Sequence, residues 1–151
     1  MKSPSPLKSP SSSPLTVAES SAYQATSTHA DVMTFIAAIP PRPAPWLQVG
    51  TMGSSAEGRE IPVLVLSKDG AFTPDQAHEK ARIEGRPVVM IVCNIHAGEV
   101  EGKEAALMLT RDILHDASVG GPLARLMSGA TIVFVPIYNP DGNRDRLSGT
   151  N

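Results

Sequence analysis

Eleven residues decide how this sequence is interpreted: Asn94-Ile95-His96-Ala97-Gly98-Glu99-Val100-Glu101-Gly102-Lys103-Glu104. They follow the apolar run Val-Val-Met-Ile-Val-Cys at 88–93 and precede a segment with helical spacing. A short apolar run bounded by polar residues predicts a strand that is buried on both faces. His96 and Glu99 then lie on the turn that leaves the carboxyl end of a central strand, where ligands gather in open α/β sheets. An imidazole and a carboxylate three residues apart can point at one spot, and zinc accepts both as ligands.

The His-x-x-Glu pattern is weak evidence by itself, because a surface histidine and a helix-capping glutamate produce the same spacing. Two other motifs flank it. One is Thr-Met-Gly-Ser-Ser-Ala-Glu-Gly-Arg-Glu-Ile at 51–61, and the other is Val-Pro-Ile-Tyr-Asn-Pro-Asp-Gly-Asn at 135–143. The three stretches, in this order, resemble the zinc carboxypeptidase family of metallopeptidases, and most closely its bacterial-type members. The resemblance extends over residues 48–151.

The resemblance implies a single Zn²⁺ ion with His96 and Glu99 as two of its ligands. It implies hydrolysis of C-terminal peptide bonds in a peptide or small amide substrate. It also implies an α/β fold with a mixed, mainly parallel sheet and flanking helices, of which this chain would form the amino-terminal part. The family's second histidine ligand and its general-base glutamate belong to later motifs, which do not occur before Asn151. We therefore assign no catalytic or substrate-binding residue, and we expect the 151-residue chain alone to be inactive.

Two other functions remain open at this point. A deacylase of N-acyl amino acids would use a related His-x-x-Glu zinc motif, although the turn at 53–59 and the turn at Asn139 favour the peptidase. A non-catalytic zinc-binding or interaction domain fits the missing ligand and base equally well.

Composition excludes several classes of protein. The 13 basic and 15 acidic side chains give a net charge of −2, which argues against a nucleic-acid groove or binding to an anionic membrane surface. Cys93 is the single cysteine, so an intrachain disulfide and a thiolate zinc site are excluded, and its apolar surroundings predict an inert buried thiol. Neither a membrane-spanning run nor a secretory signal is visible, which favours a cytoplasmic location.

The order of predicted elements suggests one domain after a tail. Residues 1–20 are rich in Ser and Pro and are predicted to be a disordered tail, while 21–151 would form the domain portion. The predicted elements are a helix at 28–39 with Thr28 and Asp31 as a capping pair, a strand at 61–67 after the turn at 53–58, a short helix at 74–83, and a strand–helix–strand unit over 88–138.

The helix after the central strand shows two stripes. One carries Gly102, Ala106, Leu109 and Ile113, and we expect it to face the core. The other carries Glu104, Arg111 and His115, and we expect it to face water. The turn Asn-Pro-Asp-Gly at 139–142 leaves the second strand of the unit, so it should lie beside His96 and Glu99 if the two strands are neighbours.

Overall fold

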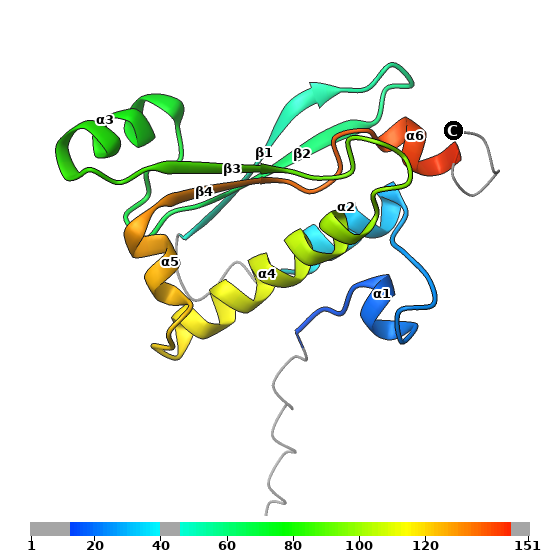
Figure 1. Ribbon diagram of the computed structural model, residues 1–151, viewed down its shortest axis with the longest axis horizontal. Helices are drawn as coiled ribbons and strands as arrows, with labels where there is room; N and C mark the ends of the chain where they lie inside the picture. The colour runs from blue at the N-terminus through cyan, green and yellow to red at the C-terminus, as the bar shows by residue number, and fades with distance from the viewer. Residues whose placement is uncertain (1–12, 40–45, 146–151) are drawn as a thin grey trace, which may run out of the picture.

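The computed structural model describes residues 13–39 and 46–145 (Figure 1). In these ranges four strands form one sheet in the order β1-β2-β4-β3. Their bounds are β1 Leu47–Ser54, β2 Glu60–Leu66, β3 Val88–Val92 and β4 Thr131–Val135. The β1–β2 and β2–β4 pairs are antiparallel and the β3–β4 pair is parallel. The predicted α/β fold with a mixed sheet and flanking helices is therefore confirmed, but the described part of the sheet is only partly parallel where a mainly parallel sheet was predicted. The parallel pair joins the two strands expected to carry the site.

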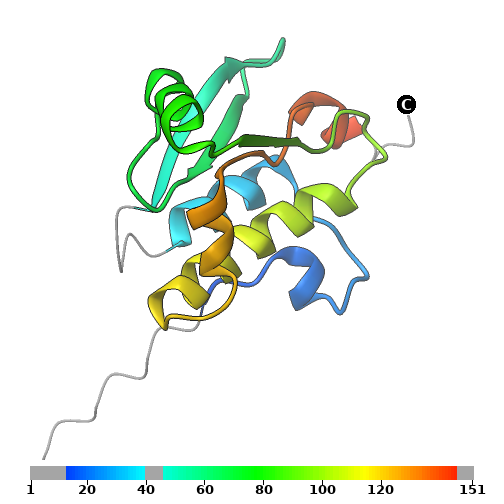
Figure 2. The same ribbon diagram turned by 60° about the vertical axis from the view of Figure 1, so that its left-hand side comes forward.

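Helices lie on both sides of this sheet. Figures 1 and 2 show α2 and α4 along one face, α1 on the outer side of α4, and α3 on the opposite side of the sheet. The bounds are α1 Val17–Ser20, α2 His29–Ala38, α3 Pro74–Glu84, α4 Glu101–Ser118, α5 Ala124–Gly129 and α6 Pro140–Asp145. None of the helices in the described ranges has both the length and the apolarity that crossing a bilayer requires.

The core forms where the sheet meets α2 and α4. Alternate residues of β2 and β4 point to the helices, as the two-residue period of a strand requires. Buried side chains in this cluster come from both strands and both helices: Val32, Phe35, Ile36, Leu64, Leu66, Leu107, Ile113, Ile132 and Phe134. The core therefore holds α4, and with it the residues that follow the zinc motif, against the centre of the sheet.

Helix α2 begins where the sequence predicted. The Thr28 hydroxyl accepts a hydrogen bond from the Asp31 amide at 3.2 Å, and the Asp31 carboxylate accepts one from the Thr28 amide at 2.8 Å. This capping box satisfies amide groups that have no partner inside the helix. Helix α3 begins in the same way with Thr73 and Gln76, and it extends the predicted short helix by one residue. Both helix predictions are confirmed.

Strand β3 differs from its prediction. The exposed fractions of Val88, Val89, Met90 and Ile91 are 46%, 42%, 52% and 37%, so these side chains are not buried on both faces. The reason is the position of β3 at the edge of the sheet: among the described residues it pairs with β4 alone. The apolar run correctly predicted a strand, but strand order decides burial and is a property of the whole sheet.

The stripes predicted on α4 are partly wrong. Leu109, expected in the core, is 37% exposed, and Glu104, expected in water, is buried. The chain before α2 causes the difference, because it folds over the stripe that carries Glu104 and Arg111. Arg111 binds Glu19 at 2.7 Å in a pair that is largely buried, while His115 is exposed as predicted.

The predicted disordered tail at 1–20 extends too far towards the domain, because its last residues are ordered. Residues 1–12 lie outside the described residues, but Val17–Ser20 form helix α1, whose capping box joins Thr16 and Glu19. Thr16 is 2% exposed. The contacts of α1 with α4 stabilise this short helix, and a composition-based prediction of disorder does not include such contacts.

Cys93 is 8% exposed and packs on the first turn of α4. A Cβ placed on Gly102 would lie 3.3 Å from Cys93 Cβ, so the glycine allows the helix to approach the strand end closely. Burial raises the pKa of the Cys93 thiol above 9.0, which reduces the fraction of reactive thiolate at neutral pH.

We therefore expect Cys93 to react with iodoacetamide at least about tenfold more slowly in the folded chain than in the chain unfolded in urea. Mass spectrometry at timed intervals measures both rates. Equal rates in the two states would show that the thiol is accessible and that its buried position is wrong.

The edge of β3 that has no partner among the described residues should cause self-association, because unpaired strand edges with apolar side chains pair with other chains. We expect sedimentation velocity to show oligomers that increase with concentration, and Met90→Lys to reduce them. The matched control is Ile83→Lys, which removes from α3 an apolar side chain that is 63% exposed, against 52% for Met90, and should leave association unchanged. A monomeric wild type at every concentration, or equal effects of the two substitutions, would contradict this expectation.

Candidate zinc site at the carboxyl end of β3

The loop 93–100 between β3 and α4, called the His96 loop below, depends on Asn94. This residue has a positive φ of 53°, a conformation that asparagine tolerates better than most residues. Its side chain is 2% exposed, and its amide group donates to the carbonyl oxygens of His96 at 3.2 Å and Glu99 at 3.3 Å. Asn94 thus holds together the backbone of the two predicted zinc ligands.

His96 and Glu99 face each other on this loop. The distance between His96 Nδ1 and Glu99 Oε1 is 2.8 Å, and the His96 amide donates to Glu99 Oε2 at 3.2 Å. Hydrogen bonds from His96 lower the pKa of Glu99 below its usual value of 4.5. The side chains are 79% and 58% exposed, so both are open to water and to an incoming ligand.

The two side chains fit a zinc ion as a pair of ligands. Imidazole nitrogen and carboxylate oxygen are ordinary zinc donors at about 2.1 Å, and two such atoms on a tetrahedral ion lie about 3.4 Å apart. The separation of 2.8 Å is shorter, and small rotations of two exposed side chains are enough to widen it. Within the described ranges, no group of three or more His, Cys, Asp or Glu side chains lies close enough to hold one metal ion.

The Asn-Pro-Asp-Gly turn lies beside the His96 loop, as the sequence predicted for neighbouring parallel strands. It forms the start of α6, with Asn139 Oδ1 accepting the Gly142 amide at 2.9 Å. The Asn139 amide donates to the Asn94 carbonyl at 3.1 Å, and Asn139 Nδ2 donates to the Ile95 carbonyl at 3.2 Å. A Cβ on Gly142 would lie 2.6 Å from Asn139 Nδ2, so glycine permits this contact.

The turn between β1 and β2 reaches the same place. Ser55 Oγ donates to Asp141 Oδ1 at 2.8 Å, the Glu57 amide donates to Asp141 Oδ2 at 3.1 Å, and Arg59 Nη1 lies 2.5 Å from Asp141 Oδ1. We call Ser55, Glu57, Arg59 and Asp141 the Asp141 cluster. It brings the first and third sequence motifs into contact, so all three motifs meet at one end of the sheet.

Sequence reasoning missed a buried charged network behind the site. Lys103 is fully buried, and its ammonium group donates to the Ser27 carbonyl and, at 2.6 Å, to Asn143 Oδ1. Glu104 accepts hydrogen bonds from the Thr26 hydroxyl at 2.7 Å and from the Ser27 amide at 2.5 Å. The sequence offered no local signal for this network, because the groups that satisfy Glu104 and Lys103 lie at least 40 positions away in the chain.

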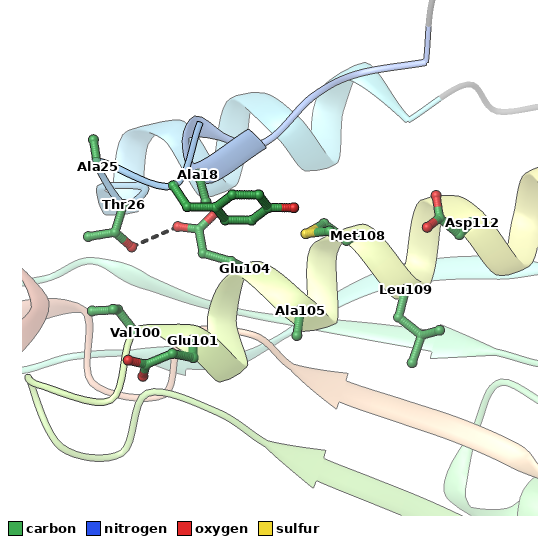
Figure 3. Close-up of a pocket in the computed structure, with 11 residues that line it drawn as sticks. Ala18, Ala25, Thr26, Val100, Glu101, Glu104, Ala105, Met108, Leu109 and Asp112 are labelled. Carbon is green, nitrogen blue, oxygen red and sulfur yellow. Dashed lines mark hydrogen bonds between the residues drawn. The ribbon is translucent and has the colours of Figure 1, made fainter. Parts of the chain in front are cut away.

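A separate hollow of about 700 Å³ lies between α1 and α4 (Figure 3). Its surface is mostly apolar, with Ala105, Met108 and Leu109 on the α4 side, and Figure 3 shows the hydrogen bond from Thr26 to Glu104 at its edge. Neither His96 nor Glu99 lines it. The hollow is therefore distinct from the candidate zinc site.

Comparison with known proteins shows to which family the chain belongs. The model of the zinc carboxypeptidase family matches residues 34–146. The chain belongs to this family. Carboxypeptidase D of Drosophila melanogaster is 30% identical over 100 residues, which are 66% of this chain and 6% of that protein. Carboxypeptidase Z of Homo sapiens is 33% identical over 93 residues, which are 61% of this chain and 13% of that protein.

A solved structure shows the same fold. That of thrombin activatable fibrinolysis inhibitor matches with a TM-score of 0.63 and 20% identity, covering 82% of this chain and 28% of that chain. The chain therefore spans less than a third of the length of each of these three proteins.

The other histidines of this chain lie in unrelated settings. His29 Nε2 is 2.7 Å from the Glu60 carbonyl, at the start of α2. His78 on α3 is exposed, and so is His115 near the end of α4, for which the sequence predicted exposure. None of the three joins His96 and Glu99 in a metal-binding group of the described residues.

The Asp141 cluster should make stability depend on pH. Burial by itself raises the pKa of Asp141, but its hydrogen bonds with Ser55, the Glu57 amide and Arg59 outweigh burial, and the net pKa lies below 3.8. A lowered folded-state pKa means that the contribution of this carboxylate is present above the unfolded pKa and is lost as pH falls through the folded one.

We expect Asp141→Asn to reduce the free energy of unfolding most above about pH 5, and the difference from wild type to shrink below about pH 3. Urea unfolding over a pH series measures this difference. Ser55→Ala keeps the carboxylate and two of its partners, so it should show the same trend with a smaller difference. A difference that stays constant from neutral pH to pH 3 would contradict the assigned role of the carboxylate.

Proposed function

We propose that His96 and Glu99 are co-ligands of one Zn²⁺ ion in a metallocarboxypeptidase site that acts on the C-terminal end of a peptide or small amide substrate. One observation carries the proposal. In a chain of the zinc carboxypeptidase family, the imidazole and the carboxylate lie 2.8 Å apart on an exposed loop at the carboxyl end of β3.

The residues of the His96 loop have separate tasks in this proposal. His96 and Glu99 donate to the metal, and Asn94 holds their backbone in the conformation that brings the two side chains together. A bound zinc ion supplies a water with a pKa near 7 and polarises a substrate carbonyl. The exposure of both ligands leaves room for water and substrate on the same side of the loop.

The chemistry of a catalytic zinc site requires more than these two residues. Such a site has three protein ligands, of which His96 and Glu99 account for two. The two relatives described above are carboxypeptidases, which supports peptide hydrolysis over the deacylation of N-acyl amino acids. A non-catalytic zinc-binding domain remains the outcome to expect if zinc binds to a complete family member without turnover.

Zinc titration of the 151-residue chain tests the ligand pair. We expect one Zn²⁺ per chain, bound more weakly than at a three-ligand site because water completes the coordination. His96→Ala should abolish this binding, and the control His78→Ala, which removes an exposed histidine from α3, should leave it unchanged. Calorimetry gives both stoichiometry and affinity. Equal binding by wild type and His96→Ala would refute the assignment.

We expect the zinc-loaded chain of 151 residues to have no measurable turnover on C-terminal peptide substrates. The reason is the lack of an assigned general base, a group typically worth 10²–10⁴-fold in rate. An assay with hippuryl-type substrates and a panel of N-acyl amino acids checks this. Tight, stoichiometric zinc with chelator-sensitive turnover would overturn the expectation and would assign the third ligand to His29, His78 or His115.

A further inference from the structure

The His96 loop has little packing to hold it. Its two ligand side chains are 79% and 58% exposed, and the strand that leads into it is at the edge of the sheet. The loop therefore depends for its shape on hydrogen bonds that other residues make to its backbone. Two of these come from Asn139, through its amide to the Asn94 carbonyl and through Nδ2 to the Ile95 carbonyl.

Asn139 in turn directly precedes α6, a helix of six residues that needs support from outside. The Asp141 cluster supplies it on one side, where three donors from the β1–β2 turn surround one carboxylate. Lys103 supplies it on the other side by donating to Asn143 Oδ1 at 2.6 Å. Hydrogen bonds thus hold Asp141 to the β1–β2 turn and Asn139 to the loop that carries His96, and the backbone of Pro140 joins Asp141 to Asn139.

We propose that the β1–β2 turn is a positioning element of the zinc site. Ser55, Glu57 and Arg59 hold Asp141 and so keep Asn139 against the His96 loop. This contact raises the zinc affinity of the site that the loop carries. The inference rests on the proposed function for its metal, but the positioning itself is a property of the metal-free chain. None of the four residues of the Asp141 cluster needs to touch zinc or substrate.

The physical reason is preorganisation. A metal site binds weakly when its ligands must first be ordered, and removal of groups that orient ligands costs 10–100-fold in metal affinity in known sites. Asp141 does not contact the zinc ligands and acts on them only through Asn139. We therefore expect its substitution to lower zinc affinity about tenfold, which is the lower end of that range.

The chain offers a matched control at the opposite end of the sheet. Asp69 follows β2 and binds Arg86 at 2.5 Å and Lys80 at 3.0 Å, and hydrogen bonds there also lower its pKa despite burial. Asp69→Asn therefore removes a comparable carboxylate–arginine pair. It should lower stability without reaching the His96 loop.

The experiment compares wild type, Asp141→Asn and Asp69→Asn in the full 151-residue chain. The first readout is zinc affinity by competition with a chromophoric chelator. The second is the amide hydrogen exchange of Asn139 and Tyr138 in the metal-free chain, because their amides donate to the Asn94 and Cys93 carbonyls. We expect Asp141→Asn to lower zinc affinity about tenfold and to accelerate exchange at Asn139, and Asp69→Asn to change neither.

Arg59→Lys and Ser55→Ala are milder variants that keep the experiment decisive if Asp141→Asn fails to fold. Arg59→Lys retains the charge and should retain more affinity than Arg59→Ala. Equal effects of Asp141→Asn and Asp69→Asn on both readouts would overturn the inference, since the cluster would then contribute stability alone.

Failure of the inference and failure of the proposed function give different results. If wild type binds no zinc, the proposed function fails, and exchange at Asn139 decides the positioning by itself. If wild type binds zinc through His96 and Asp141→Asn binds it equally well with unchanged exchange, the positioning fails and the zinc site stands.

Discussion

The arrangement of the site depends on one carboxylate. Asp141 accepts hydrogen bonds from a side chain, a backbone amide and a guanidinium group that all belong to the turn between β1 and β2. Without this interaction, α6 would lose its hydrogen bonds to the β1–β2 turn and would keep those that Asn143 makes with Lys103 and that Asn139 makes with the His96 loop. With it, the turns that leave β1 and β4 lie side by side with the loop that leaves β3. The position of one element thus follows from a contact between residues more than 80 positions apart in the chain.

A buried hydrogen-bond network on the first turn of α4 also stabilises this region. Lys103 and Glu104 follow the zinc motif directly, and their charged groups are satisfied by the chain segment before α2 and by Asn143. Buried charges are tolerated when they are fully hydrogen-bonded, and the loss of one partner leaves the other uncompensated. The network therefore ties the amino-terminal segment, the start of α4 and α6 to one another. It also explains why α4 turns a charged stripe inward.

The fold places its reactive loop at the boundary between a packed and an open region. On one side, α2 and α4 cover β2 and β4 with a continuous apolar core. On the other side, β3 exposes apolar side chains along an edge that pairs with β4 alone among the described residues. The two candidate ligands at this boundary are open to water, and the shape of their loop depends on hydrogen bonds more than on close packing. Asn94 and Asn139 supply those bonds.

The sequence by itself determined the elements and the candidate ligands. The capping pair of Thr28 and Asp31, the apolar runs of β3 and β4 and the spacing of His96 and Glu99 are local patterns, and local patterns are visible in a sequence. Only the tertiary structure decided that β3 is an edge strand, that Glu104 is buried and that Asp141 binds Arg59. Each of these depends on which distant segments meet, and the free energy of such contacts is shared between residues that no local pattern connects.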